Sequence, residues 1–179
     1  FAQQKTNWLG TGKVVDPYNY QQIKSANFTN GAVSSAHPLA SMVGAQIMKS
    51  GGNAFDAAIA TQLTLAVVFP YAGNIGGGGF LVGRKKNGEL VGLDFREAAP
   101  SKASRDMYLD KNKKPIPNMS TKGYMAVGVP GNLAGLDYIL KKYGTKTFKE
   151  LSKDAINYAQ NGFAVDEHFA VASETLFKR

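Results

Sequence analysis

The segment from Ala54 to about Phe69 restricts the possible folds most strongly, because it predicts a helix that is apolar on nearly all sides. Asn53 stands where a helix cap is expected, and Pro70 ends the segment. A helix with no polar face is stable only where other parts of the protein cover it on several sides. The chain must therefore build a fold of several layers around this helix.

The remaining segments predict one β-hairpin and several further helices. Residues 80–84 and 90–96 flank Asn87-Gly88, a turn pair in which both positions accept positive φ. A short strand is predicted at 32–36, and further helices are predicted at 38–49, 130–143, 148–161 and 166–179. The apolar faces of the first three of these helices are predicted to contain Leu39, Met42, Val43 and Ile47; Leu133, Leu136, Leu140 and Tyr143; and Phe148, Leu151, Ala155 and Tyr158.

The element order predicts a layered α/β fold with helices on a mostly antiparallel sheet. Two or three strands make a small sheet for so many helices, so the chain is expected to form an incomplete part of a larger fold. Residues 1–30 are polar and weakly patterned, and they predict an N-terminal arm. Residues 31–179 then form the patterned part, an incomplete domain.

Charge and composition narrow the classes of partner and site. The net charge of +8 would suit a nucleic acid, but the lysines fall at turns, in a loop and at a helix end, so no nucleic-acid partner is expected. The chain has no Cys and only two His, His37 and His168, so no metal site is expected. No cofactor is expected either. Polar residues interrupt the longest apolar run, so no membrane span is expected.

A run of four glycines, Gly76 to Gly79, is the most unusual local sequence. Consecutive glycines cost backbone entropy, so some feature must require positive φ or close backbone approach there. A phosphate-binding loop is one interpretation, but the run leads into a strand instead of a helix and no Gly-Lys-Ser/Thr follows. A tight turn against a neighbouring segment, or a loop lining a cleft, is the preferred interpretation.

Arg96 is the candidate binding residue, in the sequence Asp94-Phe95-Arg96-Glu97. Strand alternation places Arg96 on the face opposite Val91 and Phe95, at the strand's exit, where it can enter a cleft. A planar guanidinium suits a carboxylate ligand. The alternative is an internal ion pair with Asp94 or Glu97, and the residues alone slightly favour that alternative.

His37 follows Ser34 and Ser35, which raises the question of a serine nucleophile with a histidine base. Such a triad needs a third group that orients the base, and no residue nearby supplies one. A hydrogen bond from the imidazole near the start of the following helix is the preferred interpretation.

Five motifs in series resemble the γ-glutamyltransferase (γ-glutamyltranspeptidase) family in their order and spacing. The resemblance covers about Gly31 to Phe163, with Gly73-Asn74 in place of the Ser-Gly that is common in the family, a change that affects only local turn geometry. The motifs are Ser34-Ser35-Ala36-His37-Pro38-Leu39-Ala40, Gly51-Gly52-Asn53-Ala54-Phe55-Asp56-Ala57-Ala58, Gly76 to Phe80, Asp94-Phe95-Arg96-Glu97 and Gly128-Val129-Pro130-Gly131.

This resemblance implies an N-terminal-nucleophile hydrolase fold, a four-layer αββα sandwich, made as a precursor that cleaves itself into a large and a small subunit. The chain would be the front of the large subunit, with the rest of that subunit and the small subunit as its partners. The nucleophile would be a threonine at the start of the small subunit, so no catalytic residue is expected in this chain. Arg96 would grip the α-carboxylate of the γ-glutamyl group, which reverses the preference for an internal ion pair.

The implied activity is cleavage of the γ-glutamyl amide of glutathione-like compounds, with transfer of the acyl group to water, amino acids or peptides. A cephalosporin-type glutaryl acylase and a capsule-polymer depolymerase of the same superfamily are alternatives, and a non-catalytic binding fragment or a basic surface adhesin is an alternative of another class. The opening Phe1-Ala2-Gln3-Gln4 lacks an initiator Met and resembles the trace of a removed secretory signal. A periplasmic or secreted protein is therefore expected.

Overall fold

The computed structural model describes residues 27–165, 169–171 and 173–174. The chain divides into two compact units, one formed by Phe1–Asn74 with Tyr143–Arg179 and the other by Ile75–Lys142. The predicted arm at 1–30 lies outside the described residues except for 27–30. Most of the predicted helix at 166–179, including His168, also lies outside them, although residues 169–171 and 173–174 are helical.

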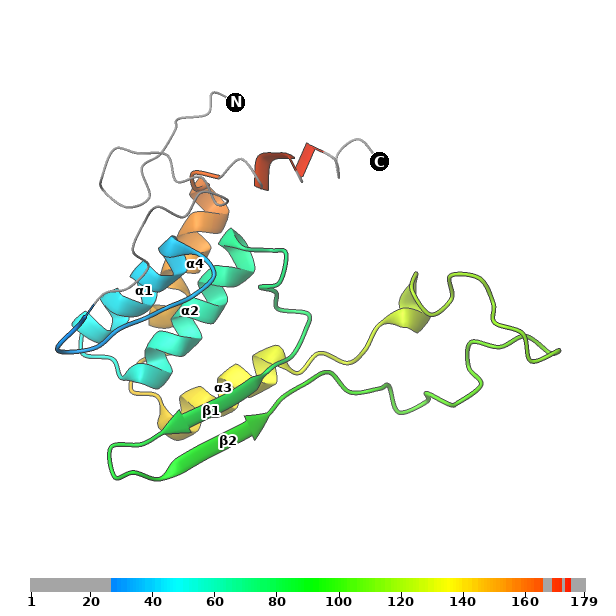
Figure 1. Ribbon diagram of the computed structural model, residues 1–179, viewed down its shortest axis with the longest axis horizontal. Coiled ribbons are helices and arrows are strands. Elements are labelled where there is room, and N and C mark those ends of the chain that lie inside the picture. Colours follow the sequence, from blue (N-terminus) through cyan, green and yellow to red (C-terminus); the bar gives the residue numbers. More distant parts are fainter. Residues whose placement is uncertain (1–26, 166–168, 172, 175–179) are drawn as a thin grey trace. The chain divides into compact units, whose positions relative to one another are not determined.

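The first unit is helical (Figure 1). It contains α1 (Pro38–Lys49), α2 (Ala54–Val68) and α4 (Phe148–Asn161), as the sequence predicts. Helix α2 packs against both α1 and α4, so the expected cover on more than one side is confirmed. Ile59, Ala60 and Val68 of α2 are almost completely buried. Burial on this scale is the main stabilising contribution to such a unit.

Side-chain caps define where α2 and α4 begin. Asn53 accepts hydrogen bonds from the backbone N–H groups of Phe55 and Asp56, and Asp56 accepts one in return from Asn53 N–H. Thr147 and Glu150 make the same reciprocal arrangement at the start of α4. These capping boxes satisfy backbone donors that no helical carbonyl can reach.

The second unit contains the hairpin and one helix. Strands β1 (Phe80–Arg84) and β2 (Leu90–Asp94) pair antiparallel, and α3 (Asn132–Tyr143) lies along the hairpin (Figure 1). The turn residue Gly88 has φ +89°, as the Asn-Gly pair predicts. Residues 95–131 form a long loop with a short 3₁₀ helix at Tyr124–Ala126.

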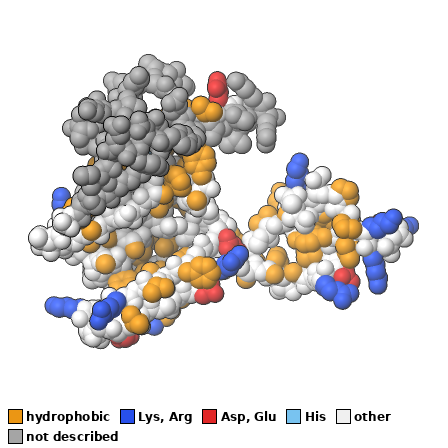
Figure 2. Space-filling view, in the orientation of Figure 1, with side chains coloured by type: hydrophobic (Ala, Val, Ile, Leu, Met, Phe, Trp, Pro, Cys, Tyr) orange, Lys and Arg blue, Asp and Glu red, His pale blue; other side chains and the backbone are white. Residues whose placement is uncertain are grey.

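The two faces of the hairpin differ in burial. Val91 is buried, whereas Val82 and Leu90 on the other face are 88% and 76% exposed and Phe80 is also exposed. Hydrophobic side chains accordingly lie at the surface over the hairpin (Figure 2). An apolar sheet face of this kind is what a layer of a larger sandwich presents.

Some local predictions were wrong. Residues 32–36 form no strand, because a strand needs a paired neighbour and the described residues provide none there. Helix α3 begins at Asn132 instead of Pro130, because the first helical hydrogen bond runs from Gly135 N–H to the Gly131 carbonyl. The N–H groups of Gly131 and Asn132, which no helical carbonyl can reach, donate to the carbonyl of Gly77. The second strand ends at Asp94, before Arg96.

The predicted apolar faces were correct only in part. Three of their members are exposed: Met42, Leu133 and Phe148. Buried positions that were not predicted include Ala40, Gly44 and Ile139. Helical spacing alone does not say which neighbouring element covers a face.

Candidate functional site

Arg96 lies where the chain changes its pairing partner. Just before it, Phe95 and Gly79 exchange two backbone hydrogen bonds, with N···O distances of 3.0 and 3.4 Å. Just after it, Ala98 and Val129 exchange another two, at 3.1 and 2.8 Å. The backbone of Arg96 is therefore held from both ends.

Glycines approach this turn from two sides. A Cβ added at Gly78 would lie 2.6 Å from the Phe95 carbonyl oxygen and 2.7 Å from Arg96 Cα. A Cβ added at Gly131 would meet the same Phe95 oxygen. The expectation that the glycine run turns closely against a neighbouring segment is confirmed. The contact from Gly131 was not predicted, although the Pro130-Gly131 pair before a helix was a signal for it.

The Arg96 side chain is exposed, and its contacts bear on the internal ion pair that is the alternative interpretation. Asp94 Oδ1 accepts a hydrogen bond of 2.9 Å from the backbone N–H of Arg96, so this carboxylate holds the backbone. Among the described residues, neither Asp94 nor Glu97 forms an ion pair with the guanidinium. The guanidinium therefore remains available to an anionic ligand.

An open hollow of about 470 Å³ adjoins Arg96 within the second unit. Tyr108 lines it, and the Tyr108 hydroxyl donates to the carbonyl of Met125 at 2.8 Å, next to the lining residue Ala126. Its walls are largely apolar and carry two charged side chains, Arg96 and Glu97, of which only the guanidinium suits a carboxylate on a ligand. The lining residues include Arg96, Glu97, Ala99, Pro100, Met107 and Val127.

His37 is the N-cap of α1. Its Nδ1 accepts a hydrogen bond of 3.3 Å from Leu39 N–H, as the preferred interpretation predicts. The Ser35 hydroxyl donates to the His37 carbonyl at 2.9 Å and lies 2.8 Å from the Ser41 hydroxyl. These contacts fasten the start of the helix and do not join imidazole to hydroxyl.

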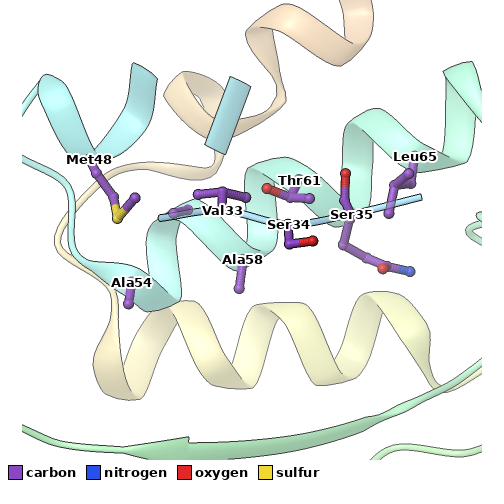
Figure 3. Close-up of a pocket in the computed structure, with 10 residues that line it drawn as sticks. Val33, Ser34, Ser35, Met48, Ala54, Ala58, Thr61 and Leu65 are labelled. Carbon is purple, nitrogen blue, oxygen red and sulfur yellow. The ribbon is translucent and has the colours of Figure 1, made fainter. Parts of the chain in front are cut away.

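A second hollow, of about 330 Å³, lies in the first unit beside α2 (Figure 3). Ser34, Ser35 and Thr61 contribute hydroxyls to it, among mostly apolar neighbours such as Met48 and Leu65. None of the described residues that line it is an acid, a base or otherwise charged.

No cluster of three or more His, Cys, Asp or Glu side chains suitable for a metal occurs within residues 27–165, 169–171 and 173–174. In the same part of the chain, no helix combines the length and hydropathy needed to cross a membrane.

Comparison with known proteins gives consistent matches. The family model described as gamma-glutamyltranspeptidase matches residues 40–179. A glutathione hydrolase proenzyme from Pseudomonas sp. (strain A14) is 51% identical over 138 residues, which are 77% of this chain and 24% of that protein. The chain thus spans about a quarter of the length of the curated relatives it matches.

Solved structures agree with the sequence matches. The crystal structure of Helicobacter pylori gamma-glutamyltranspeptidase superposes with a TM-score of 0.80 and 49% identity, covering 87% of this chain and 44% of that one. A cephalosporin acylase from Bacillus halodurans superposes with a TM-score of 0.72 and 33% identity, covering 86% of this chain and 28% of that one.

Proposed function

Because the chain belongs to the gamma-glutamyltranspeptidase family, we propose that the complete enzyme containing it cleaves the γ-glutamyl amide of glutathione-like compounds. The acyl group then passes to water, an amino acid or a peptide. The fold class is the expected one, an incomplete part of the layered α/β fold of N-terminal-nucleophile hydrolases. Activity is proposed only for this chain together with the rest of the large subunit and the small subunit of the same precursor.

In this proposal, Arg96 binds the α-carboxylate of the γ-glutamyl donor. The observation that carries the proposal is an exposed guanidinium that no described carboxylate occupies, on a backbone that is held at both ends. A planar guanidinium can donate two parallel hydrogen bonds to a carboxylate, and this geometry fixes the direction of the ligand. The nucleophile, a threonine at the start of the small subunit, would then meet a donor that is already oriented.

Arg96→Lys in the complete enzyme tests this role, because it keeps the charge but loses the paired donors. The loss of one charge-assisted hydrogen bond of about 1.5–3 kcal/mol predicts a KM for the γ-glutamyl donor that is about ten- to a hundredfold higher. Arg84→Lys, on the exposed edge of β1, is the matched control and should leave KM unchanged. If Arg96→Lys behaves like the control, the assignment is wrong.

A cephalosporin-type glutaryl acylase is the second candidate, because the superposition with such an acylase is close. Its identity of 33% is lower than the 49% found with the Helicobacter pylori gamma-glutamyltranspeptidase, and this favours the γ-glutamyl donor. A glutaryl group lacks the α-amino group of a γ-glutamyl group. Parallel assays of γ-glutamyl and glutaryl anilides on the complete enzyme separate the two, and a higher kcat/KM for glutaryl anilide would favour the acylase.

We also propose that the enzyme acts in the periplasm or outside the cell. The family resemblance supports this proposal, and the test is to measure γ-glutamyl anilide cleavage in separated cell fractions. Activity confined to the cytoplasmic fraction would contradict it.

A further inference from the structure

We infer that Gly78 and Gly131 are positioning residues for Arg96. Their missing side chains let two separate segments close on the backbone of residues 95–97, and this contact sets the direction from which Arg96 reaches the donor carboxylate. The inference rests on the proposed function of Arg96. Neither glycine would touch the substrate; each would act through the arginine.

The three atoms nearest to a Cβ at Gly78 all belong to the backbone. A methyl carbon placed on Gly78 would lie 2.6 Å from Phe95 O, 2.7 Å from Arg96 Cα and 2.7 Å from Glu97 N. Carbon atoms that are not bonded stay about 3.5–4.0 Å apart at their optimum, so a methyl group has no room here. A flexible side chain could turn away, but a backbone cannot, so any substituent at Gly78 must displace Arg96.

Gly131 closes on the same turn from another part of the chain. Its added Cβ would meet the oxygen and carbon of the Phe95 carbonyl, and would lie 3.0 Å from Arg96 O. The two glycine segments are also tied to each other, because Gly77 O accepts hydrogen bonds from Gly131 N at 3.0 Å and from Asn132 N at 2.9 Å. The space around the Arg96 backbone therefore cannot widen by moving one segment alone.

Not every glycine of the run is crowded in this way. Gly76 belongs to the same run, yet a Cβ there would meet nothing within 4 Å. Neither Gly76 nor Gly78 has a positive φ, so alanine is compatible with both backbones and only the contact differs. This difference gives Gly78→Ala a matched control in Gly76→Ala.

Asp94 supplies a third constraint that does not depend on packing. Its Oδ1 accepts the Arg96 N–H at 2.9 Å, and its side chain is exposed, so its replacement should not disturb the core. Asp94→Ala removes this acceptor, whereas Asp94→Asn retains an oxygen at the same position. The pair tests backbone positioning in a variant that is expected to fold.

The experiment measures KM and kcat for a γ-glutamyl anilide, with the variants made in the complete, processed enzyme. Because a displacement of about 1 Å can reduce catalytic efficiency a hundredfold, Gly78→Ala should raise KM by about tenfold or more, and Gly76→Ala should change it less than about twofold. The kcat per processed molecule should change much less than KM, because the carboxylate is bound alike in the ground and transition states. Asp94→Ala should give a higher KM than Asp94→Asn.

An equal KM in Gly78→Ala and Gly76→Ala would overturn the inference, and so would a fall in kcat alone. If Gly78→Ala yields no processed enzyme, the Asp94 variants decide, and equal KM values for them would overturn the inference. Arg96→Lys in the same assay distinguishes a failure of this inference from a failure of the proposed function. If Arg96→Lys raises KM and Gly78→Ala does not, only this inference is contradicted. If Arg96→Lys leaves KM unchanged, the proposed function of Arg96 is contradicted.

Discussion

Asp56 is the buried carboxylate whose removal should cost the first unit most stability. It is fully buried, and its two oxygens accept four hydrogen bonds. Oδ1 accepts from Thr145 N–H at 2.9 Å and Lys146 N–H at 3.2 Å, and Oδ2 accepts from Asn53 N–H at 2.8 Å and the Thr145 hydroxyl at 2.7 Å. One side chain thus joins the start of α2 to the turn between α3 and α4.

The hydrogen-bond geometry predicts how much stability Asp56→Asn loses. Asparagine has one acceptor oxygen, so in either orientation of its amide Asp56→Asn sets an NH₂ group against a backbone N–H donor. Two of the four bonds are lost if the NH₂ group faces the N–H groups of Thr145 and Lys146, and one is lost if it faces Asn53 N–H, because the Thr145 hydroxyl can then accept. At about 1.5–3 kcal/mol for each bond to a charged group, reduced by partial hydration of the turn, we expect a loss of about 2–4 kcal/mol. Thr145→Val removes only the hydroxyl bond and should cost about 1 kcal/mol.

Hydrogen exchange on the complete enzyme provides the assay, because it reports opening of this turn separately from the rest of the molecule. The amides of Thr145 and Lys146 should exchange fastest in Asp56→Asn, more slowly in Thr145→Val and most slowly in the unmutated enzyme. Urea unfolding should give the same order of midpoints. Equal protection in Asp56→Asn and the unmutated enzyme would refute the reasoning.

The stabilisation that Asp56 provides should depend on pH. Burial raises the pKa of Asp56, but hydrogen bonds from the Thr145 hydroxyl and from the N–H groups of Asn53, Thr145 and Lys146 outweigh it, so the pKa lies below its ordinary value. A carboxylate whose pKa is lower when folded stabilises the protein above its unfolded pKa of about 3.9, and the stabilisation is lost as the pH falls through the folded value. The stability difference between the unmutated enzyme and Asp56→Asn should therefore shrink below about pH 4.

Two further predictions concern single hydroxyls and the hairpin turn. The Thr61 hydroxyl is buried without a hydrogen-bond partner among the described residues, so Thr61→Val should leave the free energy of unfolding unchanged or raise it by up to about 1 kcal/mol. Thr64→Val breaks a 2.8 Å bond to Ala60 O and should therefore lower the free energy of unfolding. A Thr61→Val variant that is less stable than Thr64→Val would contradict this. Gly88→Ala should cost about 1 kcal/mol because φ is +89°, and Gly92→Ala, which has open space and no positive φ, should cost less; equal melting temperatures would count against the turn assignment.

Signals within short stretches of sequence were enough to predict most of the secondary structure. Asn53 as the cap of α2, Asn87-Gly88 as the hairpin turn and Pro38 at the start of α1 all act through neighbouring backbone groups. Such interactions involve residues only a few positions apart, so their chemistry can be recognised without knowing the rest of the fold. Strand alternation likewise predicted correctly that Val91 is buried, whereas Arg96, which is exposed, lies beyond the end of the strand.

The tertiary structure decided what surrounds these elements. The contacts of Arg96 come from the glycine run and from the segment before α3, and the partners of Asp56 lie far along the chain in the turn before α4. The same applies to Met42, which helical spacing predicted to be buried but which is exposed. No local pattern encodes such pairings, because they depend on which distant segments meet, and those meetings are fixed by the packing of the whole unit.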